Sequence, residues 1–451
     1  MRAVAPARAL TLAGCLVLEL ALLGCSASSS QEPGADGAPP ADTSTDTGQP
    51  GPPVDTGAPS DAQATDAPGD ARPSDAGSTS VDGASDGPTD GATATTSIVV
   101  HYPVPTGHSL TLRGSGGPLN WDAGVPLTPA TQGDAGEPNV WTATLSITSP
   151  LQIKPLYDDL TWAIGPNWTV TPGVTLDVWP HFFTENGTIT AIDNWYSQLL
   201  GNARTIWVYT PPSYAENPDE RFPVAYFQDG QNDFYDDMSF SGVAWDLQGA
   251  MDQGAQDGTI HEAILVGIAN AGTNRTWEYT PNPDPADGLD GGGAATYLGF
   301  VATELKPAID MQYPTEPDRA NTALCGSSLG GLVSIYGGIL NPETFGLIGA
   351  LSPSTWWDSE WILAQVEATQ GAALLPFRVY LDSGNAGVFP QPDPWPAQAN
   401  YDDWTQTLQL SQAYATTGVD LDYLVQDGGQ HSEVYWKERV PGTLAFLFGP
   451  R

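Results

Sequence analysis

The stretch TALCGSSLGGLVSIYGG, residues 322–338, joins a short apolar run to a longer apolar segment through a cluster of small residues. The first run has the length and composition of a buried strand, and the segment after the cluster has the period of a helix. Between them, GSSLG matches G-x-S-x-G, in which small flanking residues permit a strained turn that lifts a serine hydroxyl above the edge of a sheet. We therefore predict a strand–turn–helix junction with Ser328 at the turn.

Context distinguishes Ser328 from a chance match. The chain has 50 glycines, and GASDG at residues 83–87 also fits the pattern, although Ser85 lies where no strand or helix is expected. The helix after Ser328 offers free backbone N–H groups and the positive end of its dipole to a developing oxyanion. The N–H of Leu329 is the first candidate donor.

Residues 196–451 alternate between strand-like and helix-like segments. The strand-like runs include RTIWVYTP, PVAYFQDG, AILVGIAN and FRVYLDSG, and helix-period segments such as ATYLGFVATELKPAIDMQY lie between several of them. This alternation predicts an α/β fold, a doubly wound and mostly parallel sheet with helices on both faces.

Residues 97–195 contain short alternating runs, such as SIVVHYPV and VWTATLSI, broken by Gly, Pro and Asn. This pattern predicts an all-β sandwich. The layout LRGSGGPLNWDAGVPL, then VWTATLSI, then LQIKPL resembles starch-binding and related early-set modules, which implies a carbohydrate-binding domain beside a catalytic one. Trp121, Trp162 and Trp168 are candidates for stacking on sugars, and packing in the core is their alternative role.

Residues 1–24 have the layout of a secretory signal, with two arginines before an apolar run. LLGC, which ends at Cys25, resembles a bacterial lipobox and implies an exported protein with a lipid anchor on Cys25, most simply in the outer membrane. The alternative is a secreted protein cut near Ala27. If Cys15 is removed with the signal, Cys325 is the single cysteine of the folded part, which excludes an intrachain disulfide there.

Residues 25–96 consist mainly of Ala, Gly, Pro, Ser, Thr and Asp. Such a segment buries too little apolar surface to offset its ordering entropy, so we predict a disordered tether. Twelve acidic residues and one basic residue, Arg72, lie between positions 26 and 96, and their repulsion favours an extended chain.

The whole chain is strongly acidic. Its formal net charge is -39, with 14 basic residues. Binding to nucleic acid requires clustered Lys and Arg, so this composition argues against a nucleic-acid partner.

A serine nucleophile needs a base, and the chain has five histidines, namely His101, His108, His181, His261 and His431. The first three belong to the predicted sandwich or its exit, and His261 lies in a charged loop before a strand. His431 follows the last strand-like run, in VQDGGQHSEVYW, where two glycines free the loop. This position fits the order serine, acid, histidine that is expected of this fold.

The acid that would orient the imidazole should follow the strand FRVYLDSG. Asp382 ends that strand, and Asp402 and Asp403 come later, at the start of the next predicted helix. Either of the later pair can reach back toward the histidine, and the role of a helix N-cap explains each of them equally well.

Residues 195–450 resemble the putative esterase family of α/β-hydrolases, the group that contains esterase D, feruloyl esterases and enterochelin esterases. The motifs that carry the resemblance are YFQDGQNDF, VGIANAGTNRTWEYTP, ELKPAIDMQY, GSSLGGL, LSPSTWW and GGQHSEVYW. The resemblance implies a cofactor-free and metal-free serine esterase. It also implies a small-molecule or carbohydrate-linked ester substrate, a siderophore ester among them, because enterochelin esterases also carry an N-terminal sandwich.

Carried over by position, the resemblance implies that Ser328 is the nucleophile and His431 the base. The backbone N–H near Gln231, in the DGQ that begins at Asp229, is the implied second oxyanion donor. The implied substrate-binding residues, for some of which an ion pair between loops is the alternative role, are Asp229, Arg275, Glu278, Trp356 and Trp357.

The chain departs from the family at the acid. Many relatives carry Asp or Glu where this sequence has Gly387, and the insertion VFPQPDPWPAQANY implies that Asp402 or Asp403 replaces it, with Asp382 as a third candidate. Two other functions stay open. One is acyl transfer to an alcohol by the same fold, and the other is a non-catalytic surface lipoprotein that binds carbohydrate.

Overall fold

The computed structural model describes residues 93–130, 139–372, 375–386 and 404–450. The predicted signal, Cys25 and almost all of the predicted tether lie outside these ranges, as do Asp402 and Asp403. Within the described ranges, no helix combines the length and the apolar character needed to cross a membrane.

The N-terminal part of the described chain contains two small sheets. Apart from the parallel pair β1–β9, their strands pair antiparallel. The first sheet has the order β4-β5-β1-β9 and comprises β1 (Ala94–His101), β4 (Thr128–Pro129), β5 (Val140–Ile147) and β9 (Leu176–Val178). The second comprises β2 (Leu110–Gly114), β3 (Val125–Pro126), β6 (Leu151–Tyr157), β7 (Thr161–Trp162) and β8 (Trp168–Val170). Side chains of both sheets, such as Val100 and Ile153, meet in one buried cluster.

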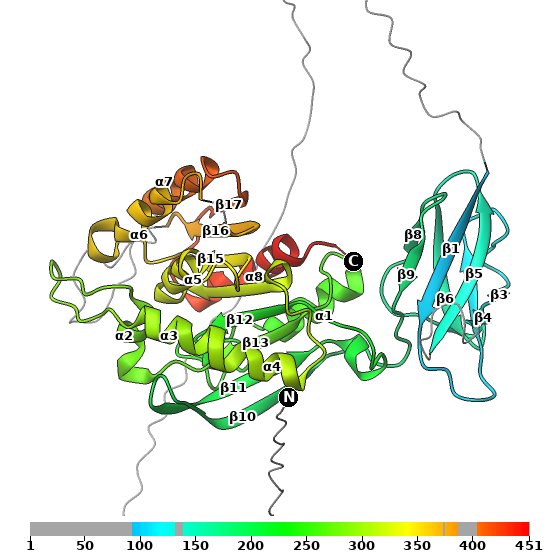
Figure 1. Cartoon of the computed structure of the whole chain (residues 1–451), viewed down its shortest axis with the longest axis horizontal. Helices are drawn as coiled ribbons and strands as arrows, with labels where there is room; N and C mark the ends of the chain where they lie inside the picture. The colour runs from blue at the N-terminus through cyan, green and yellow to red at the C-terminus, as the bar shows by residue number, and fades with distance from the viewer. Residues whose placement is uncertain (1–92, 131–138, 373–374, 387–403, 451) are drawn as a thin grey trace, which may run out of the picture. The chain divides into compact units, whose positions relative to one another are not determined.

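An eight-stranded sheet forms the centre of the larger domain (Figure 1). Its order is β10-β11-β13-β12-β14-β15-β16-β17. The strands are β10 (Thr188–Ser197), β11 (Asn202–Thr210), β12 (Val224–Gln228), β13 (Ile264–Ile268), β14 (Thr322–Ser327), β15 (Leu347–Leu351), β16 (Arg378–Gly384) and β17 (Asp420–Gln426). The six strands from β12 to β17 run parallel, and β10 and β11 are antiparallel additions at one edge. The central strands are buried along their whole length, as expected of a parallel sheet covered on both faces.

One predicted boundary differs from the structure. The sequence prediction ended the sandwich at residue 195, but β10 begins at Thr188 and pairs with β11 in the large sheet. Period-two alternation is common to strands of both domains, so the pattern alone could not assign β10 to either one.

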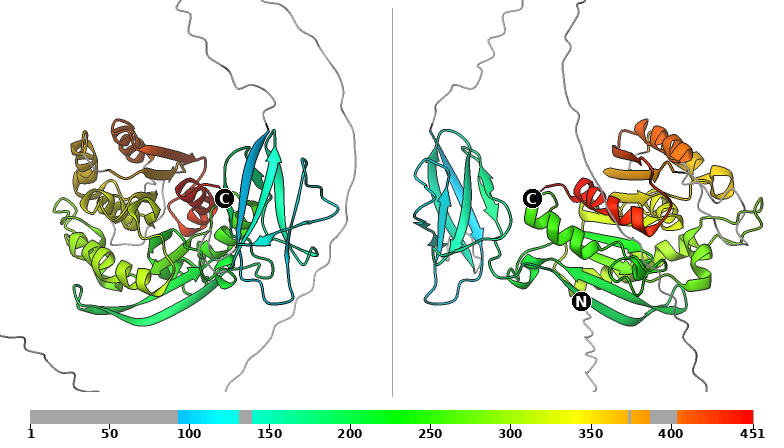
Figure 2. Two further views of the ribbon diagram at one scale, coloured as in Figure 1. Left: turned by 45° about the vertical axis from the view of Figure 1, so that its right-hand side comes forward. Right: turned by 180° about the vertical axis from the view of Figure 1, so that it is seen from behind.

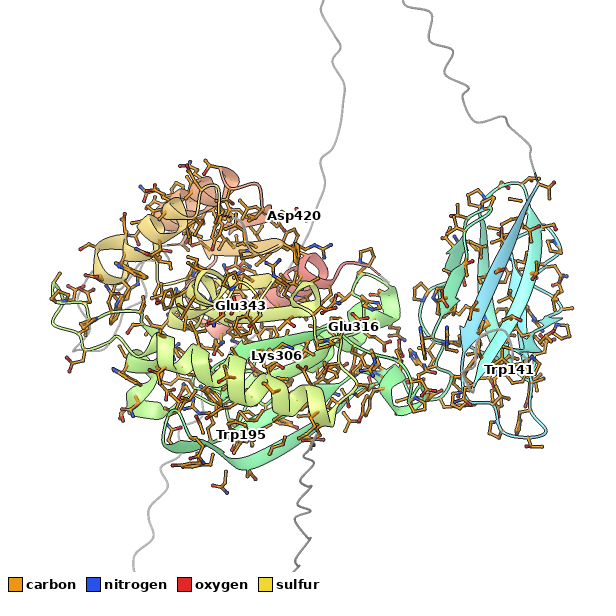
Figure 3. All side chains as sticks on the ribbon, viewed as in Figure 1. Trp141, Trp195, Lys306, Glu316, Glu343 and Asp420 are labelled. Carbon is orange, nitrogen blue, oxygen red and sulfur yellow. The ribbon has the colours of Figure 1, made fainter. Side chains whose placement is uncertain are left out.

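Helices cover both faces of the large sheet. Helices α1 (Leu247–Asp257) and α8 (Glu433–Phe448) pack on one face through a cluster that includes Met251 and Leu444, and Figure 2 shows them side by side. The opposite face is covered by α2 (Arg275–Tyr279), α3 (Ala294–Phe300), α4 (Lys306–Gln312), α5 (Leu329–Leu340), α6 (Trp357–Ala368) and α7 (Trp404–Ala415). Figure 3 labels Lys306 at the start of α4 and Trp195 of β10, whose ring centroid lies 5.3 Å from that of Phe300.

Short helical turns complete the domain. These are η1 (Pro212–Ala215), η2 (Gly230–Asn232), η3 (Gly272–Asn274), the π-turn η4 (Val301–Leu305) and η5 (Arg319–Asn321). The carboxyl ends of parallel strands lie on the same side of the sheet, which we call its carboxyl edge. The segments after β12, β13, β14, β15, β16 and β17 therefore gather there. That edge carries Gln231 after β12, Ser328 after β14 and His431 after β17.

Candidate active site

Ser328 occupies the junction between β14 and α5, as the sequence predicts. Its backbone has φ 56° and ψ -123°, a conformation that costs free energy for a residue other than glycine. The turn is held because the Ser328 N–H donates to the Leu351 carbonyl at 3.0 Å and the Ser354 N–H donates to the Ser328 carbonyl at 3.0 Å. The Ser328 side chain remains partly exposed, although both flanking residues are buried.

The glycines around Ser328 are required by close packing. A Cβ on Gly326 would lie 2.7 Å from the carbonyl carbon of Gly330, and a Cβ on Gly330 would lie 3.0 Å from the Gln228 side chain. A Cβ on Gly331 would lie 3.1 Å from the Cα atom of Pro353. The first turn of α5 therefore lies directly against the end of β12 and the segment after β15, which explains the small residues of GSSLGG.

The segment after β12 forms the second half of the site. Asp229 adopts a left-handed conformation, with φ 63°, and leads into η2, which carries Gln231. A Cβ on Gly330 would lie 3.4 Å from Asp229 Oδ2, so η2 and the first turn of α5 are close neighbours. The N–H of Leu329 is the first of the helix and has no acceptor within it. The structure thus brings Ser328, Leu329 and the DGQ segment together.

Arg275 and Asp229 form a two-point ion pair beside η2. Arg275 Nε and Nη2 each donate to a different oxygen of Asp229 at 2.7 Å, and Asn270 Nδ2 donates to Asp229 Oδ1 at 2.6 Å. Burial alone would lower the pKa of Arg275, but the Asp229 carboxylate raises it. The guanidinium also lies over the ring of Tyr279, whose hydroxyl accepts the Asp229 N–H at 3.1 Å. These contacts fix the strained Asp229 backbone from which η2 starts.

His431 lies between β17 and α8, at the same edge of the sheet as Ser328. Its ring contacts Trp436 edge to face, with centroids 4.9 Å apart. Trp436 Nε1 donates to Ser352 Oγ at 3.1 Å, and the hydroxyl of nearby Ser354 lies 3.3 Å from Ser328 Oγ. The loop that carries His431 is therefore tied to the segment that contacts Ser328.

Asp382 ends β16 and takes part in a fully buried ion pair. Its Oδ1 accepts the Ser352 N–H at 2.9 Å and lies 3.0 Å from Arg439 Nη1 of α8. The side chains of Asp382 and Arg439 are 0% and 2% exposed. Arg439 Nη2 also donates to Ser352 Oγ at 3.1 Å. This arrangement gives Asp382 a structural role in anchoring α8, whereas Asp402 and Asp403 lie outside the described residues.

Two residues implied to bind substrate have other roles in the structure. Glu278 is buried and forms an ion pair with Arg204 of β11, with two hydrogen bonds of 2.8 Å and 3.0 Å. Its partner is therefore not Arg275, and its carboxylate does not face an open surface. Trp357 is 1% exposed, and its Nε1 donates to the Asn282 carbonyl at 2.8 Å, so it ties two loops together. Trp356 is partly exposed and packs beside Trp357, with centroids 5.7 Å apart.

Three neighbours of the site were not singled out from the sequence. Ser354 contacts Ser328, Asn270 contacts Asp229, and Asp233 follows η2 with a fully buried carboxyl group. Burial, and then the charge of Asp229, raise the pKa of Asp233 well above its usual range. Their position after a buried strand is the one signal that the sequence offers for them, and many loop residues share it.

A strained serine between a central parallel strand and a helix, in a sheet of this order, defines an α/β-hydrolase. Residues 197–447, more than half of the chain, match the family described as "Putative esterase". The chain belongs to that family of ester-hydrolysing enzymes, which confirms the resemblance inferred from its motifs.

Several individual proteins are similar to this chain. The Bacillus subtilis protein described as "Uncharacterized protein YbbA" is 26% identical over 265 residues, which cover 56% of this chain and 96% of that protein. Iron(III) salmochelin esterase of Escherichia coli is 28% identical over 267 residues, and this chain spans 56% of its length. The crystal structure of the BES protein from Bacillus cereus has a TM-score of 0.46 and 21% identity, covering 59% of this chain and 96% of that one.

Proposed function

We propose that the protein is a serine carboxylic-ester hydrolase that works through an acyl-enzyme on Ser328. The observation that carries the proposal is the strained, partly exposed Ser328 at the β14–α5 junction. Strain of this kind persists only where the surroundings enforce it, and here the Leu351 and Ser354 backbone and three glycines do so.

In the proposed mechanism, His431 accepts the proton of Ser328 Oγ as that oxygen forms a bond to the ester carbonyl carbon. The N–H groups of Leu329 and Gln231 donate to the oxyanion, and the loss of one such donor typically lowers kcat about 10²- to 10³-fold. The imidazolium then protonates the alkoxide as its bond to the carbonyl carbon breaks. The alcohol departs, and the acyl group remains bound to Ser328. Water, activated by the same imidazole, releases the acid and restores the serine.

The proposal is tested with 4-nitrophenyl acetate. We expect Ser328→Ala to lower kcat about 10⁴-fold or more, because the nucleophile is lost. Ser85→Ala is the matched control, since it removes the serine of the other G-x-S-x-G string and should leave the rate unchanged. A Ser328→Ala variant that keeps the wild-type rate would overturn the proposal.

Hydrolysis and acyl transfer share every step up to the acyl-enzyme. The proposal assigns hydrolysis, and a sugar or simple alcohol added to the assay distinguishes the two reactions. A transacylated product formed in preference to the free acid would assign the protein to the acyltransferases of this fold. For the substrate itself, a small-molecule ester is proposed, with siderophore and carbohydrate-linked esters as the classes suggested by the family.

A second function is favoured by the N-terminal sheets, which we propose to form a carbohydrate-binding β-sandwich. Trp121 and Trp162 are 38% and 41% exposed, with ring centroids 6.1 Å apart. Arg113 contacts both residues, since it donates to the Trp121 backbone carbonyl at 3.1 Å and lies over the Trp162 ring. Trp168, in contrast, packs against the buried cluster. Binding of soluble starch should weaken in a Trp121→Ala/Trp162→Ala variant and not in Leu160→Ala, which removes a neighbouring exposed apolar side chain.

Export and a lipid anchor on Cys25 complete the proposal. The support is the signal-like segment 1–24 and the lipobox-like LLGC. Labelled palmitate should appear on the wild-type protein in a bacterial host and be absent from Cys25→Ser. Equal label on both proteins, or on neither, would contradict the anchor.

A further inference from the structure

The carboxyl edge of the large sheet carries several carboxylates that form no ion pair with any described residue. Residues 196–451 contain nine basic and 32 acidic residues, a formal net charge of -23. Several of these carboxylates lie in the connections between the parallel strands, either directly after a strand, as Asp427 does after β17, or in the loops and helices that follow it. We call six of them the acidic rim: Asp236, Asp237, Asp287, Asp290, Glu360 and Asp427.

Hydrogen bonds tie two of the loops that carry the acidic rim to segments around the site. Asp236 Oδ1 accepts the Ala244 N–H at 2.7 Å, which fixes the loop that continues from η2. The loop with Asp287 and Asp290 is bound to the segment after β15, because Asp284 Oδ2 accepts the Asp358 N–H at 3.1 Å. That segment also carries Ser354, the hydroxyl neighbour of Ser328.

The basic residues of the described part of this domain are already engaged. Arg275, beside η2, has its Nε and Nη2 bound to Asp229. Arg221 and Arg319 donate to backbone carbonyls. The others pair with carboxylates within 4.0 Å: Arg204 with Glu278, Lys306 with Asp310, Arg378 with Asp420, Lys437 with Asp246 and Arg439 with Asp382. Figure 3 labels Lys306 and Asp420 of these pairs.

We propose that the substrate is an electrically neutral ester and that the acidic rim discriminates against anionic esters. This inference rests on the serine esterase function proposed above. A negatively charged ester approaching Ser328 would meet like charge, while the basic side chains of the described residues are already bound to carboxylates or carbonyls. Both its encounter rate and its affinity are therefore lowered. Repulsion of this kind is an effective route to specificity.

Neutral contacts are available at the same edge. The segments after β12 and β13 expose aromatic side chains, namely Tyr235 at 40%, Phe240 at 90% and Trp277 at 42%. Phe240 is held by its N–H, which donates to Asn232 Oδ1 at 3.0 Å. Aromatic faces bind aryl groups and the apolar faces of sugars without requiring a charge. A neutral aryl or sugar ester therefore fits this surface better than a polyanionic complex does.

A matched pair of substrates tests the inference, 4-nitrophenyl methyl adipate and the anionic 4-nitrophenyl hydrogen adipate. Both carry the same leaving group and the same adipoyl chain, and they differ at its far end, which is a neutral methyl ester in one and a carboxylate in the other. At about 0.01 M salt we expect kcat/KM to be about tenfold higher for the neutral ester, and at about 1 M salt the ratio should approach one because the field is screened.

Variants assign the effect to the acidic rim. Asp236→Asn/Asp237→Asn should raise the ratio of kcat/KM for the anionic ester to kcat/KM for the neutral ester about two- to fivefold at low salt. Asp257→Asn is the matched control, because Asp257 ends α1 ahead of β13, at the opposite edge of the sheet, and we expect no change.

The outcomes separate this inference from the proposed function. Equal or faster hydrolysis of the anionic ester, a preference that salt does not alter, or an effect of Asp257→Asn equal to that of the rim variant would overturn the inference. In each case hydrolysis that depends on Ser328 would still support the esterase. Loss of Ser328 dependence for both esters would instead overturn the proposed function.

Discussion

Replacing Asp382 by Asn separates a structural role from a catalytic one. Asn keeps the shape of the side chain and can still accept the Ser352 N–H, but it removes the charge that faces Arg439 at 3.0 Å. Because the Arg439 guanidinium is only 2% exposed, it would remain as an uncompensated buried charge. Breaking a buried pair in this way costs about 3 to 5 kcal/mol of unfolding free energy.

Urea unfolding and ester kinetics measure the two roles in the same variant. We expect the unfolding midpoint of Asp382→Asn to fall with an unchanged m-value, while kcat of the folded fraction stays within about tenfold of wild type. The variant Asp382→Leu/Arg439→Met removes both charges and should recover much of the stability. A loss of less than about 1 kcal/mol together with a fall in kcat of about 10⁴-fold would refute the structural role and identify Asp382 as the triad acid.

Two further predictions concern the segment after β12. Because the pKa of Asp233 is raised in the folded state, its contribution destabilises the fold increasingly as pH rises above the unfolded value near 4. Asp233→Asn should therefore have the same free energy of unfolding as wild type at low pH. Above about pH 4 the variant should become more stable than wild type, by up to about 1.4 kcal/mol per pH unit, and a gain that does not change with pH would contradict this. A Cβ on Gly230 would collide with the Gly267 backbone, so Gly230→Ala should cost about 1 to 3 kcal/mol and lower kcat by displacing η2. Gly442→Ala, where a Cβ meets nothing within 4 Å, is the control, and equal behaviour of the two variants would show that η2 tolerates the shift.

The structural features that depend on local pattern could be predicted from the sequence. The apolar run, the glycines and the helix around Ser328 lie within one short stretch, and the conformation of Ser328 follows from it. The parallel sheet is likewise indicated by repeated buried runs separated by helical segments.

Parts that depend on contacts between distant residues could not be predicted. Glu278 is near Arg275 in the sequence, but it pairs with Arg204, which lies on another strand. The family resemblance implies that Trp357 binds substrate, but its buried indole donates to the Asn282 carbonyl. Pairing of this kind is determined by the tertiary fold, and neither periodicity nor residue type reports it.

The most direct test of the central claim is to locate a fluorophosphonate adduct by mass spectrometry. We predict a single adduct on Ser328 that is lost in Ser328→Ala and strongly slowed in His431→Ala. Ser354 provides a stringent comparison. Its hydroxyl lies 3.3 Å from that of Ser328, but Ser354 does not lie at the strained junction between β14 and α5. An adduct on Ser354, or no adduct on a folded protein, would contradict the assignment of Ser328 as the nucleophile.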